Sequence, residues 1–251
     1  MFCSTNERYR MQRWRELSPN PNDPKVMELR RIAISTARTE KSISDRVSYL
    51  CELVRGKSVL DIGIVEHTRD AANSQGWLHG HLKRHAARCL GVDVLEAEVG
   101  YLRAQGYDVV LADITQSPLP EKFDIIIGGE VLEHLDAPGM FVKNCAAMLN
   151  PGGRLAITVP NPWYINAIVK SCFRRYTFVD SADHVAWYDA STLLELGQRH
   201  GFELERFTGI AVRGAKTFLT RFLMKFRPLL IGMGLAPHLF SKSIIYEFVR
   251  V

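Results

Sequence analysis

The stretch VLDIGIVEHT, residues 59–68, decides how the rest of the chain is interpreted. It is a run of apolar, β-forming residues that closes on Asp61 and Gly63 and then continues as a turn. A glycine after a buried strand allows a sharp turn and a close approach of the backbone to a ligand. Nucleotide-type cofactor sites usually begin this way, with two further glycines in the turn. Because Val65 and His67 stand where those glycines are expected, we interpret the turn as remodelled by a different backbone route.

Four more short apolar runs follow, separated by segments of helical composition. A strand that helices cover on both faces reads as one continuous apolar run. Alternation of such strands with helices predicts an α/β fold with a parallel, doubly wound sheet. The carboxyl ends of its strands share one edge, where ligands bind. The predicted strands are Ser58–Ile62, Cys89–Val94, Asp108–Ala112, Phe123–Gly128 and Arg154–Val159, with helices over Leu95–Gln105 and Pro138–Leu149.

The last fifty residues predict two further strands, over 201–212 and 243–251, which bring the sheet to seven. Residues 215–240 lie between them and are apolar and basic, with almost no acid. We expect a helical insertion here that covers the sheet. An amphipathic helix lying in a bilayer interface is the alternative.

The amino-terminal part, residues 1–45, is interpreted as an arm followed by a helix, ahead of a domain that spans 46–251. Apolar residues at spacings of three and four predict two helices between Lys25 and Arg55. Ser42 followed by Asp45 is expected to cap the second of them.

The composition is that of an ordinary soluble globular protein, with 47% hydrophobic and 24% charged residues and a net charge of +5. The mild basic excess is compatible with anionic ligands or a membrane face. The five cysteines are scattered without CxxC spacing, which favours a reducing compartment over a disulfide framework or zinc site. Since neither a signal segment nor a run of about 18 apolar residues is present, we expect a cytoplasmic protein. Contact with the inner face of the membrane and the oligomeric state stay open.

An acidic residue stands at the end of each of the first three predicted strands: Asp61, Asp93 and Asp113. Each has a structural alternative, because aspartate also caps turns and helices. Three carboxylates on one edge repel each other, however, so stability alone does not explain them together. An acid after the second strand is placed to accept the hydroxyls of a ribose, and the order of the three fits one ligand.

Residues 45–212 resemble the class I S-adenosylmethionine-dependent methyltransferases, through the series VLDIG, GVDV, LADI, FDIIIGGEVLEHL, LNPGGRLAITVPN and GFELERF. The resemblance implies a Rossmann-like fold with an antiparallel carboxyl-terminal strand, and S-adenosyl-L-methionine as cofactor. The EVLEHL and LNPGG stretches resemble enzymes that methylate hydroxyls of small molecules, quinone precursors and sugars. GWLHGHL and PNPWYINAI resemble methyltransferases of bacterial surface-polysaccharide biosynthesis. The implied activity is O-methylation of a sugar, glycan-lipid or other small hydroxyl acceptor.

The resemblance also assigns residues to parts of the cofactor. It implies Asp61, Gly63 and Ile64 at the methionine end, Asp93 at the ribose, Val94, Asp113 and Ile114 at the adenine, and Gly129 and Glu130 beside the sulfonium.

Two histidines are predicted to act at the acceptor. A sulfonium already activates its methyl group, so catalysis needs alignment and, for a hydroxyl, removal of a proton. Histidine titrates near neutrality and is the natural general base. We predict His134, after the fourth strand, and His184, in the later segment DHVAWYD. A structural hydrogen bond of His134 to its loop, and a link of His184 to Asp183 or the following helix, remain open.

An insertion at 66–80 is expected to bring Trp77 and His79 over the cofactor or against the acceptor, and Trp163 is predicted as a further acceptor contact. His79, His81 and His85 form a histidine-rich stretch with His67. No acid or cysteine accompanies these histidines and cationic neighbours oppose a metal ion, so we predict no metal site.

Two other function classes stay open. The fold could serve as a non-catalytic partner or scaffold, which the substitutions at Val65 and His67 favour and the presence of Asp93 opposes. A nicotinamide dehydrogenase would need the GxGxxG turn that is missing here. Basic and aromatic residues do not concentrate in a nucleic-acid motif, so the expected partner is a small-molecule or glycan acceptor and not a nucleic acid.

Overall fold

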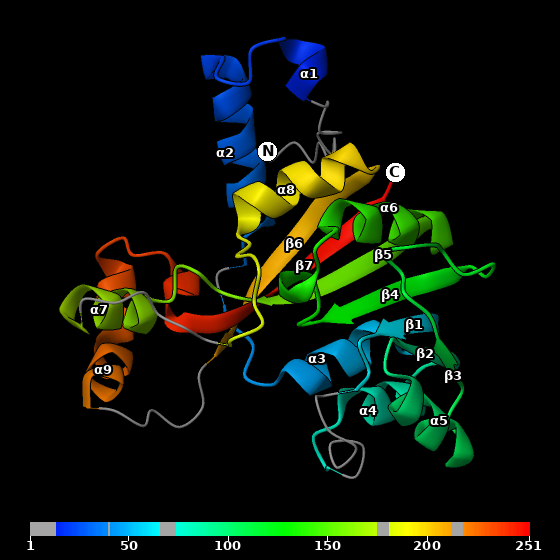
Figure 1. Cartoon of the computed structure of the whole chain (residues 1–251). Helices are drawn as coiled ribbons and strands as arrows, with labels where there is room; N and C mark the ends of the chain where they lie inside the picture. The colour runs from blue at the N-terminus through cyan, green and yellow to red at the C-terminus, as the bar shows by residue number, and fades with distance from the viewer. Residues whose placement is uncertain (1–13, 40, 66–73, 175–180, 212–217) are drawn as a thin grey trace, which may run out of the picture.

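The computed structural model describes residues 14–39, 41–65, 74–174, 181–211 and 218–251. Within these ranges the chain forms one sheet with helices on both faces (Figure 1). The strands are β1 (Ser58–Ile62), β2 (Arg88–Asp93), β3 (Val109–Leu111), β4 (Phe123–Gly129), β5 (Leu149–Pro160), β6 (Phe202–Ala211) and β7 (Ser241–Arg250).

The strands lie in the order β3-β2-β1-β4-β5-β7-β6. All pairs from β3 to β5 are parallel, whereas β7 runs antiparallel to both β5 and β6. The prediction of a seven-stranded, mostly parallel, doubly wound sheet with an antiparallel carboxyl-terminal strand is therefore confirmed.

Strand β5 begins earlier than predicted. We expected it at Arg154, where the apolar run begins. Instead Leu149 already pairs with Phe123 of β4, and the register shifts before the regular pairing resumes at Arg154. Gly152 has φ +71°, a conformation that glycine adopts readily, so the turn residues become an irregularity inside the strand.

Helices cover the sheet in two layers. One face carries α3 (Arg46–Leu53), α4 (Leu78–His85) and α5 (Glu96–Ala104), and the other α6 (Pro138–Met148) and α8 (Ala190–Arg199) (Figure 1). Successive residues of a strand point to opposite faces. Ile125 and Ile127 accordingly join the core beneath α3 and α4, while Ile126 joins the core beneath α6 and α8. Burial on both faces is why the central strands read as continuous apolar runs.

The amino-terminal helices α1 (Trp14–Leu17) and α2 (Pro24–Ala37) lie beside α8, where Arg30 pairs with Glu195 at 2.9 Å. Two helices between residues 25 and 55 were expected, and α2 and α3 confirm them. The cap of α3 is Asp45 alone, whose carboxylate accepts from Val47 N; Ser42 lies instead 3.3 Å from the Ser241 hydroxyl. The domain boundary between residues 45 and 46 stays a prediction.

The segment before β7 forms α9 (Phe218–Gly232) and the short helix η3 (Pro237–Phe240), while residues 215–217 lie outside the described ranges. Figure 1 shows α9 with α7 (Ile165–Arg174) beyond the ends of β4 and β5, not over a face of the sheet. The expected helical insertion is present, but the expectation that it covers the sheet is wrong. No helix among the described residues has the length and apolar character to cross a bilayer.

Candidate functional site

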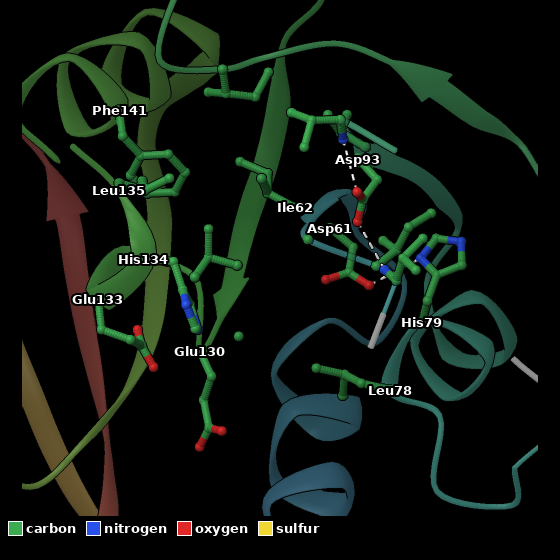
Figure 2. A pocket seen from close by; sticks show the side chains of 18 of the residues that line it. Asp61, Ile62, Leu78, His79, Asp93, Glu130, Glu133, His134, Leu135 and Phe141 are labelled. Atoms are coloured by element: carbon green, nitrogen blue, oxygen red, sulfur yellow. Dashed lines mark hydrogen bonds and ion pairs between the residues drawn. The ribbon is translucent and has the colours of Figure 1, made fainter. Parts of the chain in front are cut away.

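A cavity of about 640 Å³ opens at the carboxyl ends of the central strands, a size suited to a nucleoside-type ligand. The lining includes every residue that the sequence assigned to the cofactor: Asp61, Gly63, Ile64, Asp93, Val94, Asp113, Ile114, Gly129 and Glu130. His134 and His184 line the same cavity. Figure 2 shows Asp61 and Asp93 on one side and Glu133 and His134 on the other. The structure therefore brings the predicted cofactor and acceptor residues into one space.

Gly63 makes the turn after β1 possible. Its φ is +76°, a region that side chains with a Cβ rarely adopt. A Cβ on Gly63 would also lie 2.4 Å from Cγ2 of Val131. Any other residue would strain the backbone and displace the chain that follows β4. This glycine is thus needed for the shape of the cavity.

The turn beyond Gly63 is held by hydrogen bonds in place of further glycines. The indole Nε1 of Trp77 donates to the carbonyl oxygen of Ile64 at 2.8 Å. The backbone N–H of Val65 donates to Oδ2 of Asp93 at 2.9 Å. These two bonds fix the backbone of the turn from opposite sides. His67, the other substituted position, lies outside the described residues.

Asp61 is held by a buried histidine. Nδ1 of His79 lies 3.0 Å from Oδ2 of Asp61, and both residues are almost fully buried. His79 packs against β2 where the strand has Gly91; a Cβ there would lie 2.8 Å from Cε1 of His79. His79 and Trp77 line the cavity and also support the turn, and they are 1% and 3% exposed. A direct contact of either side chain with the acceptor stays a prediction that this burial does not favour.

Asp93 organises the backbone around the cavity. Its Oδ1 accepts from the N–H groups of Val94 and Leu95 at 2.8 and 3.1 Å, and its Oδ2 accepts from Val65. A carboxylate has about four acceptor positions, so three backbone donors leave room for a ribose hydroxyl. The bonds also fix the orientation of the carboxylate before any ligand arrives.

Asp113 and Ile114 form the far end of the cavity. Oδ1 of Asp113 accepts from the hydroxyl and the N–H of Thr115, and the hydroxyl bond chiefly lowers the pKa of Asp113. The structural alternative of a loop cap is therefore realised for this residue. The Ile114 side chain is buried, and its carbonyl accepts from Asn144 at 2.7 Å. Both residues present a fixed acidic and apolar edge to the cavity.

Glu130 follows β4 in a left-handed conformation, with φ +58°. Such a φ is unusual for a residue other than glycine and concentrates at functional sites. Its N–H donates to the Thr158 carbonyl at 2.8 Å, while its carboxylate accepts from Ser243 at 3.0 Å and lies 3.6 Å from Arg46. The carboxylate is thus anchored at the side of the cavity.

The end of the cavity where the acceptor is predicted to bind is built by the short helix η2 (Leu132–His134) and the segment 181–187. Nδ1 of His134 lies 3.1 Å from Oδ2 of Asp183. The rings of His134 and His184 are 4.8 Å apart and nearly perpendicular, at 78°. The N–H of Val185 donates to the Glu133 carbonyl at 2.9 Å, which ties the two segments together. One bond between backbones therefore brings two histidines, fifty residues apart in the sequence, into contact.

Glu133 and Asp183 are the residues that the sequence analysis missed as site residues. Glu133 is 1% exposed although it is charged, and Asp183 was named only as a structural partner of His184. A signal was present for Glu133, since an acid inside the apolar stretch EVLEHL must be compensated when it is buried.

Trp163, which the sequence predicted as an acceptor contact, is not among the residues that line the cavity. Its side chain is half exposed, and its Nε1 donates to Asp189 at 3.1 Å.

His81 and His85, the histidines that follow the insertion in α4, make other contacts. Nε2 of His81 lies 2.7 Å from the Gln75 carbonyl, and Nδ1 of His85 lies 2.9 Å from the His81 carbonyl. Among the described residues, a group with metal-ligand spacing is formed instead by Glu133, His134 and His184, whose ligand atoms lie within 4.8 Å of one another. The sequence analysis did not foresee this group.

A family model described as a methyltransferase domain matches residues 35–206. The chain belongs to this family. A "Probable S-adenosylmethionine-dependent methyltransferase" of Mycolicibacterium smegmatis is 28% identical over 69% of the chain and 61% of that relative's own length. The "Ubiquinone biosynthesis O-methyltransferase" of Coxiella burnetii is 26% identical over 66% of the chain and 72% of its own length.

Solved methyltransferases share the fold. The N-methyltransferase NodS of Bradyrhizobium japonicum, in complex with S-adenosylhomocysteine, is similar over 92% of this chain and 90% of its own, with a TM-score of 0.52 and 18% identity. Magnesium protoporphyrin IX methyltransferase of Synechocystis, also with bound S-adenosylhomocysteine, is similar over 82% of this chain and 80% of its own, with a TM-score of 0.53 and 18% identity. The family and these neighbours indicate S-adenosylmethionine as the cofactor of this methyltransferase.

Proposed function

We propose that this methyltransferase transfers a methyl group from S-adenosylmethionine to a hydroxyl oxygen of a sugar, a glycan-lipid or another small acceptor. The observation that carries the proposal is the meeting of His134, Asp183 and His184 in the cavity that also holds the three strand-end acids. A site for the donor and a group able to take up a proton therefore share one space.

The cofactor lies, in this proposal, along the strand ends. The methionine end faces Asp61 and Gly63, and the ribose hydroxyls donate to Asp93. The adenine lies against Val94, Asp113 and Ile114, and the sulfonium beside Gly129 and Glu130. Two observations support this orientation: Asp93 retains an acceptor position, and the fixed carboxylate of Asp113 stands beside an apolar surface, as an adenine requires.

The chemistry asked of the protein is modest. The cofactor supplies a methyl group already activated by the positive sulfur. A carboxylate only accepts, so Nδ1–H of His134 donates to Asp183, and this tautomer makes Nε2 the basic nitrogen of the ring. As the oxygen–methyl bond forms and the carbon–sulfur bond breaks, the hydroxyl proton passes to His134. Asp183 then stabilises the imidazolium.

The class of acceptor is supported by the base and by the relatives. An imidazole base suits a hydroxyl, because a neutral amine can attack before it loses a proton. A curated relative from Coxiella burnetii is an O-methyltransferase of ubiquinone biosynthesis. NodS is an N-methyltransferase, but at 18% identity its likeness is one of fold. We therefore infer an oxygen acceptor.

Peripheral contact with a membrane through α9 is part of the same proposal. Phe222, Phe226 and Leu229 follow each other at spacings of four and three, which places them on one stripe of α9, and Met233 directly after the helix continues it through a bond from its N–H to the Leu229 carbonyl. All four side chains are exposed, from 36% for Phe226 to 71% for Met233. Lys225 flanks the stripe, and α9 contains no acidic residue. A basic helix with an exposed apolar stripe suits the interface of an anionic bilayer.

Turnover of labelled S-adenosylmethionine tests the activity, with sugar nucleotides, polyprenol-linked sugars and quinone precursors as acceptors. We expect label in at least one hydroxyl acceptor with the wild type and with His81→Asn, a partly buried histidine of α4 that is not among the residues lining the cavity. His134→Asn should transfer label at least a hundredfold more slowly, as expected for loss of a general base. Label in amines alone would contradict the proposed acceptor class. Binding of S-adenosylhomocysteine without transfer to any acceptor would favour a non-catalytic partner or scaffold.

A further inference from the structure

We propose that His79 is a positioning residue for the cofactor: it holds the carboxylate of Asp61 in the orientation that binds the ammonium group of the methionine end. The pair sets the affinity for the amino-acid part of the ligand and leaves the affinity for the nucleoside part unchanged. The inference rests on the proposed function for the place of the methionine end at Asp61. It deepens that proposal, because it assigns the recognition of one chemical group to two side chains.

The bond from His79 occupies one oxygen of the Asp61 carboxylate. Nδ1 of His79 lies 3.0 Å from Oδ2 of Asp61. A carboxylate only accepts, so the proton of this bond is on Nδ1. Among the described residues no second donor is bonded to the carboxylate, which lines the cavity. In Figure 2, His79 approaches Asp61 from the side away from His134. Oδ1 of Asp61 therefore remains to accept from a ligand.

The ring of His79 is held in place by its neighbours. It packs on β2 where Gly91 leaves room, since a Cβ there would lie 2.8 Å from Cε1 of His79. The ring centres of Trp77 and Tyr107 lie 5.3 and 6.1 Å from that of His79, both tilted to it. A ring locked by packing presents its N–H in one direction. The orientation of Asp61 is therefore set before a ligand arrives.

The second nitrogen of the ring indicates the charge of the pair. Nε2 of His79 is buried and has no hydrogen-bond partner among the described residues. A protonated imidazole carries an N–H on both nitrogens, so the second one would be buried without an acceptor and would cost its full desolvation. A charged pair would also lose the hydration of two ions. We infer that His79 donates as a neutral imidazole, so the pair keeps the negative charge of Asp61.

This charge separates ligands that share the same nucleoside. S-adenosylmethionine and S-adenosylhomocysteine carry an ammonium and a carboxylate at the methionine end. The deamino analogue of S-adenosylhomocysteine has hydrogen in place of the amino group, and 5′-methylthioadenosine lacks the amino acid altogether. A buried negative charge needs a cation for compensation, which only the first two ligands supply. A change at His79 should therefore alter their binding and not that of the other two.

Calorimetry of the full-length protein with S-adenosylhomocysteine, its deamino analogue and 5′-methylthioadenosine tests the inference. His79→Leu removes the donor and keeps an apolar side chain of similar size. It should bind S-adenosylhomocysteine at least about tenfold more weakly than the wild type, and the other two ligands within about twofold. His79→Asn should retain most of the binding, because its amide nitrogen, like Nδ1, is bonded to Cγ. His85→Leu, the same substitution on α4 outside the cavity lining, is the control and should bind as the wild type does.

A purely structural role of His79 gives a different result. The inference is overturned if His79→Leu weakens all three ligands equally, or if it binds S-adenosylhomocysteine as the wild type does. Circular dichroism identifies a variant that does not fold. If His79→Leu is such a variant, His79→Gln decides: its amide lies one bond farther from the backbone, so it should lose the preference for the ammonium that His79→Asn retains. Equal preference in these two variants would contradict the inference.

Asp93→Ala and turnover separate this inference from the proposed function. Methyl transfer by the wild type, and weaker binding of all three ligands by Asp93→Ala, without a selective effect of His79→Leu, would remove the inference and leave the proposed function standing. A selective effect of His79→Leu without methyl transfer to any acceptor would do the reverse.

Discussion

The two ends of the cavity are built in different ways. At the cofactor end, Asp61 and Asp93 lie at the tips of central strands and are held by a buried histidine and by backbone N–H groups. At the acceptor end, His134 and His184 lie on a short helix and a loop and remain partly exposed. The residues of the cofactor end are thus part of the buried core, whereas the two histidines of the acceptor end lie at its surface. Substitutions at the first should cost stability and binding together, and those at the second should cost turnover alone.

The largest expected effect lies at the acceptor end. His134→Asn should lower kcat by about 10²–10⁴-fold, because it removes the group that deals with the hydroxyl proton. The free energy of unfolding and the affinity for S-adenosylhomocysteine should stay close to those of the wild type, since His134 is not part of the core. Chemical denaturation, calorimetry and turnover measure the three quantities. If His134→Asn lost as much unfolding free energy as variants of core residues, the proposed difference between the two ends of the cavity would be wrong.

Removal of the buried histidine tests the cofactor end. His79→Ala should reduce the free energy of unfolding by about 2–4 kcal/mol, because it leaves a cavity and a buried carboxylate without its partner. Affinity for S-adenosylhomocysteine should fall with it, since Asp61 loses its orientation. Asp61→Asn and the double variant complete a thermodynamic cycle, and the coupling between the two positions should exceed 0.5 kcal/mol. His85→Ala, on the same helix, is the control for loss of an imidazole.

The next effect separates backbone strain from crowding at Gly63. Gly63→Ala should cost about 1–2 kcal/mol for the left-handed conformation, with a further cost from the contact with Val131. Gly56→Ala is a matched control, because Gly56 has φ +67° and no atom within 4 Å of an added Cβ. Val131→Ala in the Gly63→Ala background should recover only the crowding part. Equal stability of the two alanine variants would show that the contact with Val131 is unimportant.

The smallest effect concerns His238 in η3, outside both ends of the cavity. Burial lowers the pKa of His238 from its ordinary value near 6.5. The unfolded chain therefore binds more protons than the folded protein, so the contribution of this histidine to stability is complete above about pH 6.5 and is lost as the pH falls toward its folded pKa. His238→Gln should flatten the fall in unfolding free energy between pH 7 and 5. Calorimetric unfolding at several pH values checks this, and an unchanged slope would contradict it.

The sequence was sufficient to bring the predicted cofactor residues to one cavity, because these residues are local to strand ends. Apolar runs located the strands, and their last residues then had to share one edge. The support from Trp77 and His79 was not predictable, since it depends on how an insertion folds back beneath the turn. The same holds for Glu133 and His184, whose meeting depends on a hydrogen bond between distant backbones. Helix α9 was misplaced because an apolar, basic pattern is the same whether the helix covers a sheet or extends beyond it.

The central claim is that the turn after β1 holds the cofactor without its second and third glycines. Calorimetry with S-adenosylhomocysteine on the wild type and on Asp93→Ala tests it most directly. We predict one product molecule bound per wild-type chain, and a loss of affinity of about a hundredfold in Asp93→Ala, from the lost bonds to the ribose and to Val65. Absence of binding by the wild type, or equal affinity of the two proteins, would contradict the claim.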